Sequence, residues 1–235
     1  MDGIRALTFD VFGTVVDWRG TIVREMSALG LSRGIEADWA AFADAWRAGY
    51  QPAMDLVRRG DLPWTKLDAL HRRILDELAP RFGLNGLSEA ELDAVNRVWH
   101  RLDPWSDAVE GLTRLKRRYA IATLSNGNVS LLSNMAKRAG LPWDVILSAE
   151  LAGCYKPDPR VYRKAADLLG LEPHEVVMVA AHPSDLRAAA AVGFRTAFVP
   201  RPLEHGPGST AEPAAAGEFD WTAADFVELA DRLGA

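Results

Sequence analysis

The stretch that most constrains the fold is Ala6–Asp17, which reads ALTFDVFGTVVD. It begins as a short run of apolar, strand-forming residues, and Asp10 stands where that run ends. Gly13 then allows a tight turn, and Thr14 supplies a hydroxyl group. A carboxylate at the end of a buried strand is costly to desolvate unless it is hydrogen-bonded or functional. The stretch therefore indicates either an Asp that caps the next turn or a functional carboxylate at the edge of an α/β sheet.

Strand and helix patterns alternate regularly in the second half of the chain. The predicted strands are 4–10, 120–124, 145–147, 176–180 and 195–199. The predicted helices are 106–118, 128–138, 159–169, 184–191 and about 223–233. This alternation predicts an α/β fold, a doubly wound parallel sheet of five or more strands with a Rossmann-like core. The segment 200–217 is rich in Pro, Gly and Ala, so we expect a surface loop without a fold of its own.

The strand pattern is interrupted by a long helical segment. Apolar residues there recur at helical spacing, as in Trp39, Phe42, Ala43 and Trp46. Breaks at Gly30, Gly34, 60–63 and 83–88 predict about four helices, and Ser88 with Glu91 matches a capping box. We therefore predict two domains. Residues 1–17 and 104–235 form the core, and residues 18–103 form an all-helical insertion.

Composition limits the partners that this chain is expected to have. Its 235 residues carry a formal net charge of -5, which indicates neither a nucleic-acid footprint nor a membrane-surface patch. Cys154 is the single cysteine, so no internal disulfide can form and a reducing compartment is expected. The sequence contains no recognisable leader and no apolar run long enough to span a membrane. We therefore predict a cytoplasmic protein.

Polar groups follow three further strands at the points where they end. The second strand leads into Ser125-Asn126-Gly127, and residues 155–158 beyond the third strand read YKPD. The fourth leads into residues 182–185, which read HPSD. In a parallel sheet these ends share one edge with Asp10, which is where ligands bind.

Nucleophilic catalysis by a carboxylate fits this set of groups. Lys156 would keep Asp10 ionised, although a surface lysine is the alternative. Ser125 and Thr14 could donate hydrogen bonds to Asp10 or to a bound anion, and Ser125 could instead cap a helix. Asp185 could orient a water molecule or bind a metal. Alternatively, it could simply be an acid in the first turn of a helix, where the helix dipole stabilises it.

With these residues in place, the chain resembles the haloacid dehalogenase superfamily, whose four motif regions appear in order. The helical insertion matches the family's cap domain, and we call residues 18–103 the helical cap. Phosphatases of the family carry a second Asp two residues after the nucleophile, where this chain has Phe12. They also bind magnesium through paired acids in the fourth motif, where this chain has Ala181 and Asp185. Both departures favour the L-2-haloacid dehalogenase branch, which uses no metal or other cofactor.

Three local matches support that branch. Ala45-Trp46-Arg47 resembles its cap-domain arginine, which holds the departing halide, and Ser125-Asn126-Gly127 resembles its Ser-Asn-Gly. Residues 155–162 resemble its lysine motif, including the trailing Tyr162. The resemblance implies that Arg47 and Asn126 stabilise the halide. It also implies that Phe12, Trp46 and Tyr162 belong to the substrate pocket.

Two features depart from the usual pattern of the branch. Phe12 replaces the usual Tyr after the nucleophile, and Ala180-Ala181-His182 replaces Ser-Ser-Asn before the last Asp. We interpret His182 first as a neutral hydrogen-bonding substitute for the missing amide. It could instead be the base for the hydrolytic water or a cation that helps to bind the halide.

The resemblance implies hydrolysis of a short (S)-2-haloacid to an (R)-2-hydroxyacid through an ester on Asp10. Two alternatives stay open at this point. One is a phosphatase with a degenerate motif, and the other is a non-catalytic anion-binding protein of the same fold. Relatives in the branch are commonly dimers, so a homodimer through the Trp-rich cap is also open. Halogen preference, chain length and acceptance of fluoroacetate are not readable from the sequence.

Overall fold

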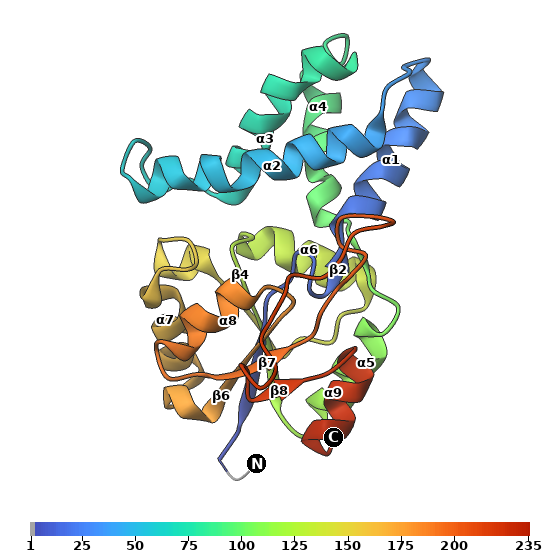
Figure 1. The fold of residues 1–235 in the computed structure, drawn as a ribbon. Coiled ribbons are helices and arrows are strands. Elements are labelled where there is room, and N and C mark those ends of the chain that lie inside the picture. The colour runs from blue at the N-terminus through green and yellow to red at the C-terminus, as the bar shows by residue number, and fades with distance from the viewer. Residues whose placement is uncertain (1–2) are drawn as a thin grey trace.

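A computed structural model of the chain describes residues 3–235, and its centre is a six-stranded parallel sheet (Figure 1). The strands run in the order β5-β4-β1-β6-β7-β8. Their bounds are β1 (Ala6–Phe9), β4 (Ala120–Ser125), β5 (Val145–Ser148), β6 (Val176–Ala180), β7 (Arg195–Phe198) and β8 (Trp221–Thr222). The chain winds outward from β1 in one direction and from β6 in the other, so the crevice between these strands is the expected ligand site.

Helices cover both faces of the sheet, which confirms the doubly wound α/β prediction (Figure 1). The core helices are α5 (Ala108–Lys116), α6 (Val129–Ala139), α7 (Pro159–Leu169), α8 (Pro183–Ala190) and α9 (Phe226–Leu233). Helices α5 and α9 pack against each other on one face, and α7 and α8 lie on the other. Short 3₁₀ helices η3 (Ala149–Ala152) and η4 (Pro173–Glu175) complete the connections.

Burial on both faces explains why β1 is apolar without alternation. Its residues are fully buried, and the register pairs Phe9 with Thr123 on one side and with Val179 on the other. The Phe9 ring meets the Phe226 ring edge to face at 5.5 Å, which ties α9 to the centre of the sheet. The end of β1, and therefore Asp10, is held in a fixed place.

The helical cap stands over the edge of the sheet where the strands end (Figure 1). It consists of α1 (Trp18–Arg33), α2 (Trp39–Arg58), α3 (Leu67–Leu78), η1 (Ala79–Phe82), α4 (Glu89–Asn96) and η2 (Arg97–His100). The capping box of Ser88 and Glu91 is confirmed. The predicted break at Gly30 is wrong, because Gly30 lies inside α1 and leaves room for the Trp39 ring.

The chain enters and leaves the helical cap through a short two-stranded ribbon. Strands β2 (Val16–Asp17) and β3 (Asp103–Pro104) are antiparallel and pair Asp17 with Asp103. We keep the division at residues 18–103 as our proposal, since this ribbon pairs the two segments by which the chain passes between the core and the cap. Within residues 3–235, no helix has the length and apolarity needed to cross a membrane.

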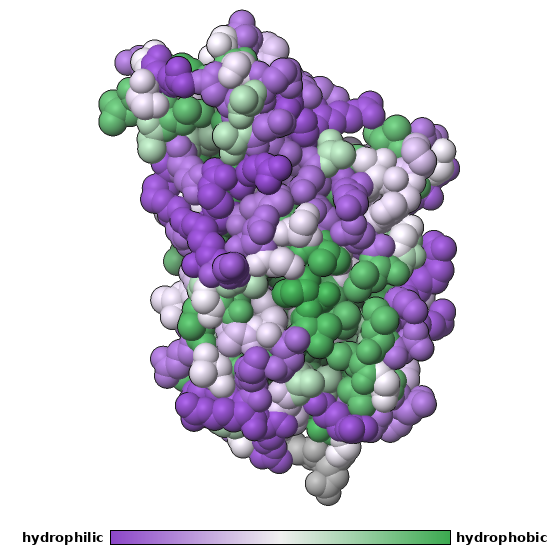
Figure 2. Space-filling model, turned by 180° about the vertical axis from the view of Figure 1, so that it is seen from behind, coloured by the Kyte–Doolittle hydropathy of each residue, from purple (hydrophilic) through white to green (hydrophobic). Residues whose placement is uncertain are grey.

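Most tryptophans of the cap are buried within this chain. Trp18, Trp46 and Trp99 are fully buried, so these rings are not free to form a dimer contact, whereas Trp64 is partly exposed. Hydrophobic residues instead gather on the core in the rear view, below a largely hydrophilic cap (Figure 2). A homodimer itself stays a prediction, which sedimentation of the purified protein tests.

The segment 200–217 contains no helix or strand and is largely exposed, as its composition predicts, but its first residues are anchored to the core. Arg201 is only 9% exposed and makes two 2.8 Å bonds to the Asp107 carboxylate. Its Nε also donates to the Thr14 carbonyl oxygen at 2.9 Å. These contacts fold the start of the segment against the turn that carries Asp10.

Candidate active site

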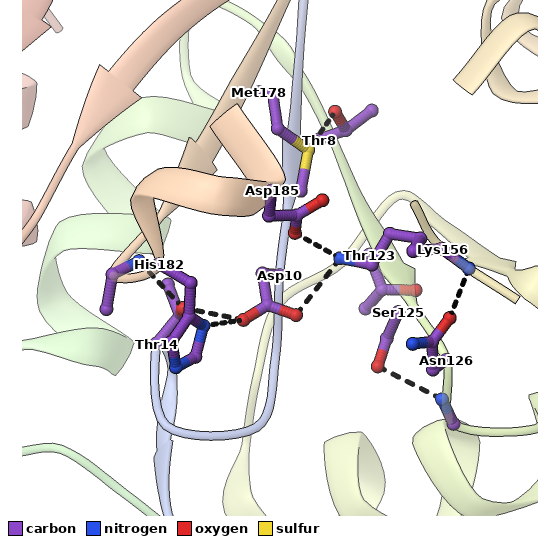
Figure 3. A network of polar contacts seen from close by, with 12 residues as sticks. Thr8, Asp10, Thr14, Thr123, Ser125, Asn126, Lys156, Met178, His182 and Asp185 are labelled. Carbon is purple, nitrogen blue, oxygen red and sulfur yellow. Dashed lines mark hydrogen bonds and ion pairs between the residues drawn. The ribbon is translucent and has the colours of Figure 1, made fainter. Parts of the chain in front are cut away.

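Asp10 lies in a tight turn directly after β1. Its backbone N–H donates to the Val179 carbonyl at 3.0 Å, and Gly13 has a φ of 82°, which favours glycine. The Thr14 hydroxyl donates to Asp10 Oδ2 at 2.8 Å and accepts a 2.9 Å bond from the Ala181 N–H. Thr14 thus links the ends of β1 and β6 and fixes the orientation of the carboxylate (Figure 3).

Lys156 lies between two carboxylates (Figure 3). Its Nζ is 3.1 Å from Asp10 Oδ1 and also donates to Asp185 Oδ2. The side chain of Asn126 accepts the Lys156 backbone N–H at 2.8 Å, which positions the lysine. Burial alone would lower the pKa of Lys156, but the two carboxylates outweigh burial and raise it. The alternative of a surface lysine is therefore wrong, since Lys156 is 6% exposed.

Asp10 is ionised although it is buried. Burial opposes its ionisation, but Lys156 and His182 outweigh burial and hold the pKa of Asp10 well below its usual range. Asp185 differs, because burial dominates there and raises its pKa. Tyr162 on α7 donates to Asp185 Oδ1 at 2.5 Å. Asp10 is thus suited to act as an anion, and Asp185 is better suited to accept a proton.

His182 is an imidazolium in this site, and our first interpretation of it as neutral is wrong. Its Nδ1 is 3.0 Å from Asp10 Oδ2, and its Nε2 is 3.0 Å from Glu204 Oε2. With acceptors on both sides, both ring nitrogens must donate. Burial alone would lower the pKa of His182, but its bonds to Asp10 and Glu204 raise it to about 10.

This shift predicts that stability falls at alkaline pH. The pKa of His182 is about 10 when folded and 6.5 ordinarily, so the folded state holds the extra proton between these values. The stabilisation is complete below about pH 6.5 and is lost as pH rises through about 10. Urea unfolding at pH 7 and pH 10 should lose more free energy in the wild type than in His182→Asn. Equal losses in the two proteins would contradict the assignment.

Arg47 on α2 covers the site from the cap side. Its guanidinium lies 4.4 Å from the centre of the Tyr50 ring and 4.0 Å from Glu204 Oε1. Its Nη1 is buried and makes no hydrogen bond to the described residues. An unpaired buried donor costs about 1–3 kcal/mol, so this nitrogen is available to a bound anion.

A cavity of about 190 Å³ connects these groups. Its wall is formed by Asp10, Phe12, Arg47, Tyr50, Gln51, Asn126, Lys156, Pro157, His182, Asp185, Glu204, His205 and Glu212. Acidic and basic side chains of the wall lie in contact with one another, and Phe12 and Tyr50 supply its aromatic part. The cavity can bind a small anion above an ionised carboxylate.

Three predicted pocket residues lie outside this wall. Trp46 is buried inside the cap, where its Nε1 donates to the His71 carbonyl at 3.0 Å. Ser125 is fully buried and accepts the Gly127 N–H at 3.2 Å, which shapes the turn that carries Asn126. Tyr162 lies behind Asp185 and holds it. These three side chains support the site and do not line it.

Among the wall residues that sequence reasoning missed, Glu204 has the most polar contacts with the site. It is 5% exposed and pairs with His182 from the segment 200–217. Burial would raise the pKa of Glu204, but His182 outweighs burial and lowers it. The only sequence signal was an acid in a segment that looked unstructured, and a loop that closes over a sheet edge is a common place for site residues.

Comparison with known proteins agrees with this geometry. A family model for haloacid dehalogenase-like hydrolases matches residues 4–193, and the chain belongs to that family. (S)-2-haloacid dehalogenase 4A of Burkholderia cepacia is 31% identical over 219 residues, covering 86% of this chain and 85% of the relative. (S)-2-haloacid dehalogenase of Pseudomonas sp. (strain YL) is 32% identical over 215 residues, with coverages of 86% and 84%.

Solved structures give the same assignment. The defluorinating L-2-haloacid dehalogenase Rha0230 matches with a TM-score of 0.95 and 48% identity, covering 99% of this chain and 96% of that one. The L-2-haloacid dehalogenase PA0810 matches with a TM-score of 0.95 and 49% identity, covering 99% of both. Within the family, the chain is an enzyme of the L-2-haloacid dehalogenase branch, as its motifs predict.

Proposed function

We propose that this enzyme hydrolyses short (S)-2-haloacids to (R)-2-hydroxyacids through an ester on Asp10 and without a metal. One observation carries the proposal. An ionised, buried carboxylate faces a small cavity in which a buried arginine nitrogen has no partner among the described residues. Rear attack by Asp10 on the carbon that bears the halogen inverts that carbon.

Hydrogen bonding indicates which oxygen of Asp10 attacks. Oδ2 accepts from Thr14 and His182, so both of its lone pairs are used. Among residues 3–235, Oδ1 accepts from Lys156 alone and keeps a free lone pair. Oδ1 is therefore the nucleophile, and Lys156 holds the carboxylate in its charged form.

Arg47 and Asn126 are the proposed stabilisers of the departing halide. Both line the cavity, from the cap and from the core respectively, and Nη1 of Arg47 has no hydrogen-bond partner in the part of the chain that the structure describes. Phe12 forms an apolar part of the wall, which strengthens electrostatic interactions by excluding water. We expect the halide to leave toward these two side chains.

Asp185 is the proposed base for hydrolysis of the ester. Its two oxygens each accept one donor, from Lys156 and Tyr162, so each keeps a lone pair for a water molecule. Its raised pKa suits proton transfer. The first turn of α8 positions it beside Asp10.

The donors that are present support the proposal that no metal is needed. Ala181 stands where a second acid would complete a magnesium site, and Lys156 already contacts both Asp10 and Asp185. The phosphatases of this family also carry a second Asp two residues after the nucleophile, and Phe12 occupies that position here. Ala181 and Phe12 therefore lack the carboxylates that the phosphatase alternative requires.

Arg47→Met should slow halide release about 100-fold, because one donor to a developing charge is worth about that much. Single-turnover halide release from (S)-2-chloropropionate measures the effect. Arg59→Met at the exposed end of the same helix is the matched control and should retain wild-type release. If both variants released halide at the wild-type rate, Arg47 would not be the halide site.

The proposal is tested by free halide released from (S)-2-chloropropionate, monochloroacetate and fluoroacetate in the presence of a chelator. We expect chloride from the first two substrates. Fluoride from the third is also expected, since the structurally similar Rha0230 is described as defluorinating. Magnesium-dependent phosphate release without halide would instead support the phosphatase. Anion binding with no turnover of either kind would support a binding protein.

A further inference from the structure

His182 and Glu204 form an ion pair directly against the proposed nucleophile. Nδ1 of His182 is 3.0 Å from Asp10 Oδ2, and Nε2 is 3.1 and 3.0 Å from the two oxygens of Glu204. The imidazolium therefore bridges the end of β1 and the segment after β7. Neither the halide site nor the hydrolytic base described above uses this pair.

Glu204 is itself held firmly. The Trp18 Nε1–H donates to Glu204 Oε1 at 3.1 Å, and Arg47 lies 4.0 Å from the same oxygen. The carboxylate also lies against Gly13, where an added Cβ would be 2.0 Å from Oε1. Glu204 thus occupies one place above the Asp10 turn and fixes the direction of His182.

We infer that His182, oriented by Glu204, is the oxyanion donor that drives hydrolysis of the ester on Asp10. The inference rests on the proposed function, because it requires that ester. When Oδ1 is alkylated, Oδ2 becomes the carbonyl oxygen of the ester. Thr14 and His182 already donate to Oδ2, so the donors are in place before charge develops there.

The water oxygen bonds to Cγ of Asp10 while Asp185 takes one of its protons, and the electron pair of the carbonyl moves to Oδ2. The Cγ–Oδ1 bond then breaks as the carbonyl pair returns, and Oδ1 leaves as the hydroxyl oxygen of the product. That oxygen gains one proton, and one further proton is released to solvent. Asp10 returns as a carboxylate, and His182 keeps its proton throughout.

Glu204 is needed because the ester removes the negative charge of Asp10. In the free enzyme, two carboxylates favour the imidazolium. In the ester, Glu204 is the remaining carboxylate in contact with it, while Arg47 and Lys156 are nearby cations that disfavour it. Glu204 is therefore a positioning residue that keeps His182 charged when the oxyanion forms.

Rapid-quench experiments with (S)-2-chloropropionate separate the two half-reactions in His182→Asn and Glu204→Gln. Chloride measures formation of the ester, and intact-protein mass measures the ester itself. In both variants, release of the first equivalent of chloride should slow far less than hydrolysis of the ester, because Lys156 still holds Asp10 in its charged form. Both should then hydrolyse the ester about 100-fold more slowly, so that it accumulates. Exposed His174→Asn and Glu110→Gln are the matched controls and should accumulate none.

The pH dependence gives a second readout that a merely structural role would not move. Ester hydrolysis in Glu204→Gln should fall as pH rises past about 6.5, where an unassisted histidine loses its proton. Wild-type hydrolysis should stay level there, because Glu204 still pairs with His182.

Three results would overturn the inference while leaving the proposed function intact. One is slower chloride release with no accumulation of ester, which would assign the pair to halide departure through Arg47. Another is ester hydrolysis at the wild-type rate in both variants. The third is a flat pH profile for Glu204→Gln. Absence of an ester in quenched wild-type enzyme under single-turnover conditions, with Asp10→Asn fully active, would instead reject the proposed function.

Discussion

Asp10→Asn should lower dehalogenation by about four to six orders of magnitude, as loss of a catalytic nucleophile does in other hydrolases. The amide keeps the size of the side chain, but its single oxygen can accept either from Lys156 or from Thr14 and His182, so the unfolding curve must show that the fold is retained. What is lost is the negative charge that attacks carbon. Initial rates of chloride release from (S)-2-chloropropionate, with unfolding curves of both proteins, measure the effect.

Asp17→Asn is the matched control for this change. Asp17 caps α1 through a 2.8 Å bond from the Gly20 N–H and lies outside the cavity. This variant should keep most of its stability and activity, because Asn caps a helix about as well as Asp. Full turnover in Asp10→Asn, or equal losses in both variants, would remove Asp10 from its proposed role.

Lys156→Met should both inactivate the enzyme and destabilise it by about 3–5 kcal/mol, the usual cost of leaving a buried charge unpaired. The ammonium group contacts two carboxylates, and its loss leaves Asp10 and Asp185 facing each other without a cation between them. The pKa of Asp10 should rise, so the variant should regain stability as pH falls. Urea unfolding between pH 7 and pH 4 measures this trend.

A double variant separates the two consequences of losing Lys156. Lys156→Met combined with Asp185→Asn removes one of the stranded charges, so part of the lost stability should return while activity stays absent. Lys164→Met, on the exposed face of α7, is the control and should change stability little. If Lys156→Met were as stable as the control, the ion pairs would not hold the site together.

The core could be predicted from sequence because its elements carry strong local signals. Strand 176–180 and helix 159–169 have the predicted bounds, since one is a continuous apolar run and the other begins at a proline and ends before a glycine. Strand β8 was missed because two residues, Trp221 and Thr222, form no readable pattern. Its pairing with β7 depends on tertiary structure alone.

Local sequence patterns predicted the site mainly where strand ends fix it, and the family resemblance added Arg47 from the cap. Asp10, Lys156 and Asp185 follow from the parallel topology, which brings strand ends to one edge. Glu204 could not be found this way, because nothing local distinguishes it from a solvated acid. The protonated state of His182 was missed for the same reason. It depends on an acceptor that is 22 positions away in sequence.

Single-turnover hydrolysis in water labelled with heavy oxygen tests the ester on Asp10 most directly. With enzyme in excess over (S)-2-chloropropionate, the product takes its hydroxyl oxygen from Asp10, and water replaces that oxygen in the protein. We expect the label in the peptide that contains Asp10 and none in the product of the first turnover. Label in the product, with an unlabelled Asp10 peptide, would mean that water attacks the substrate directly and would contradict the mechanism.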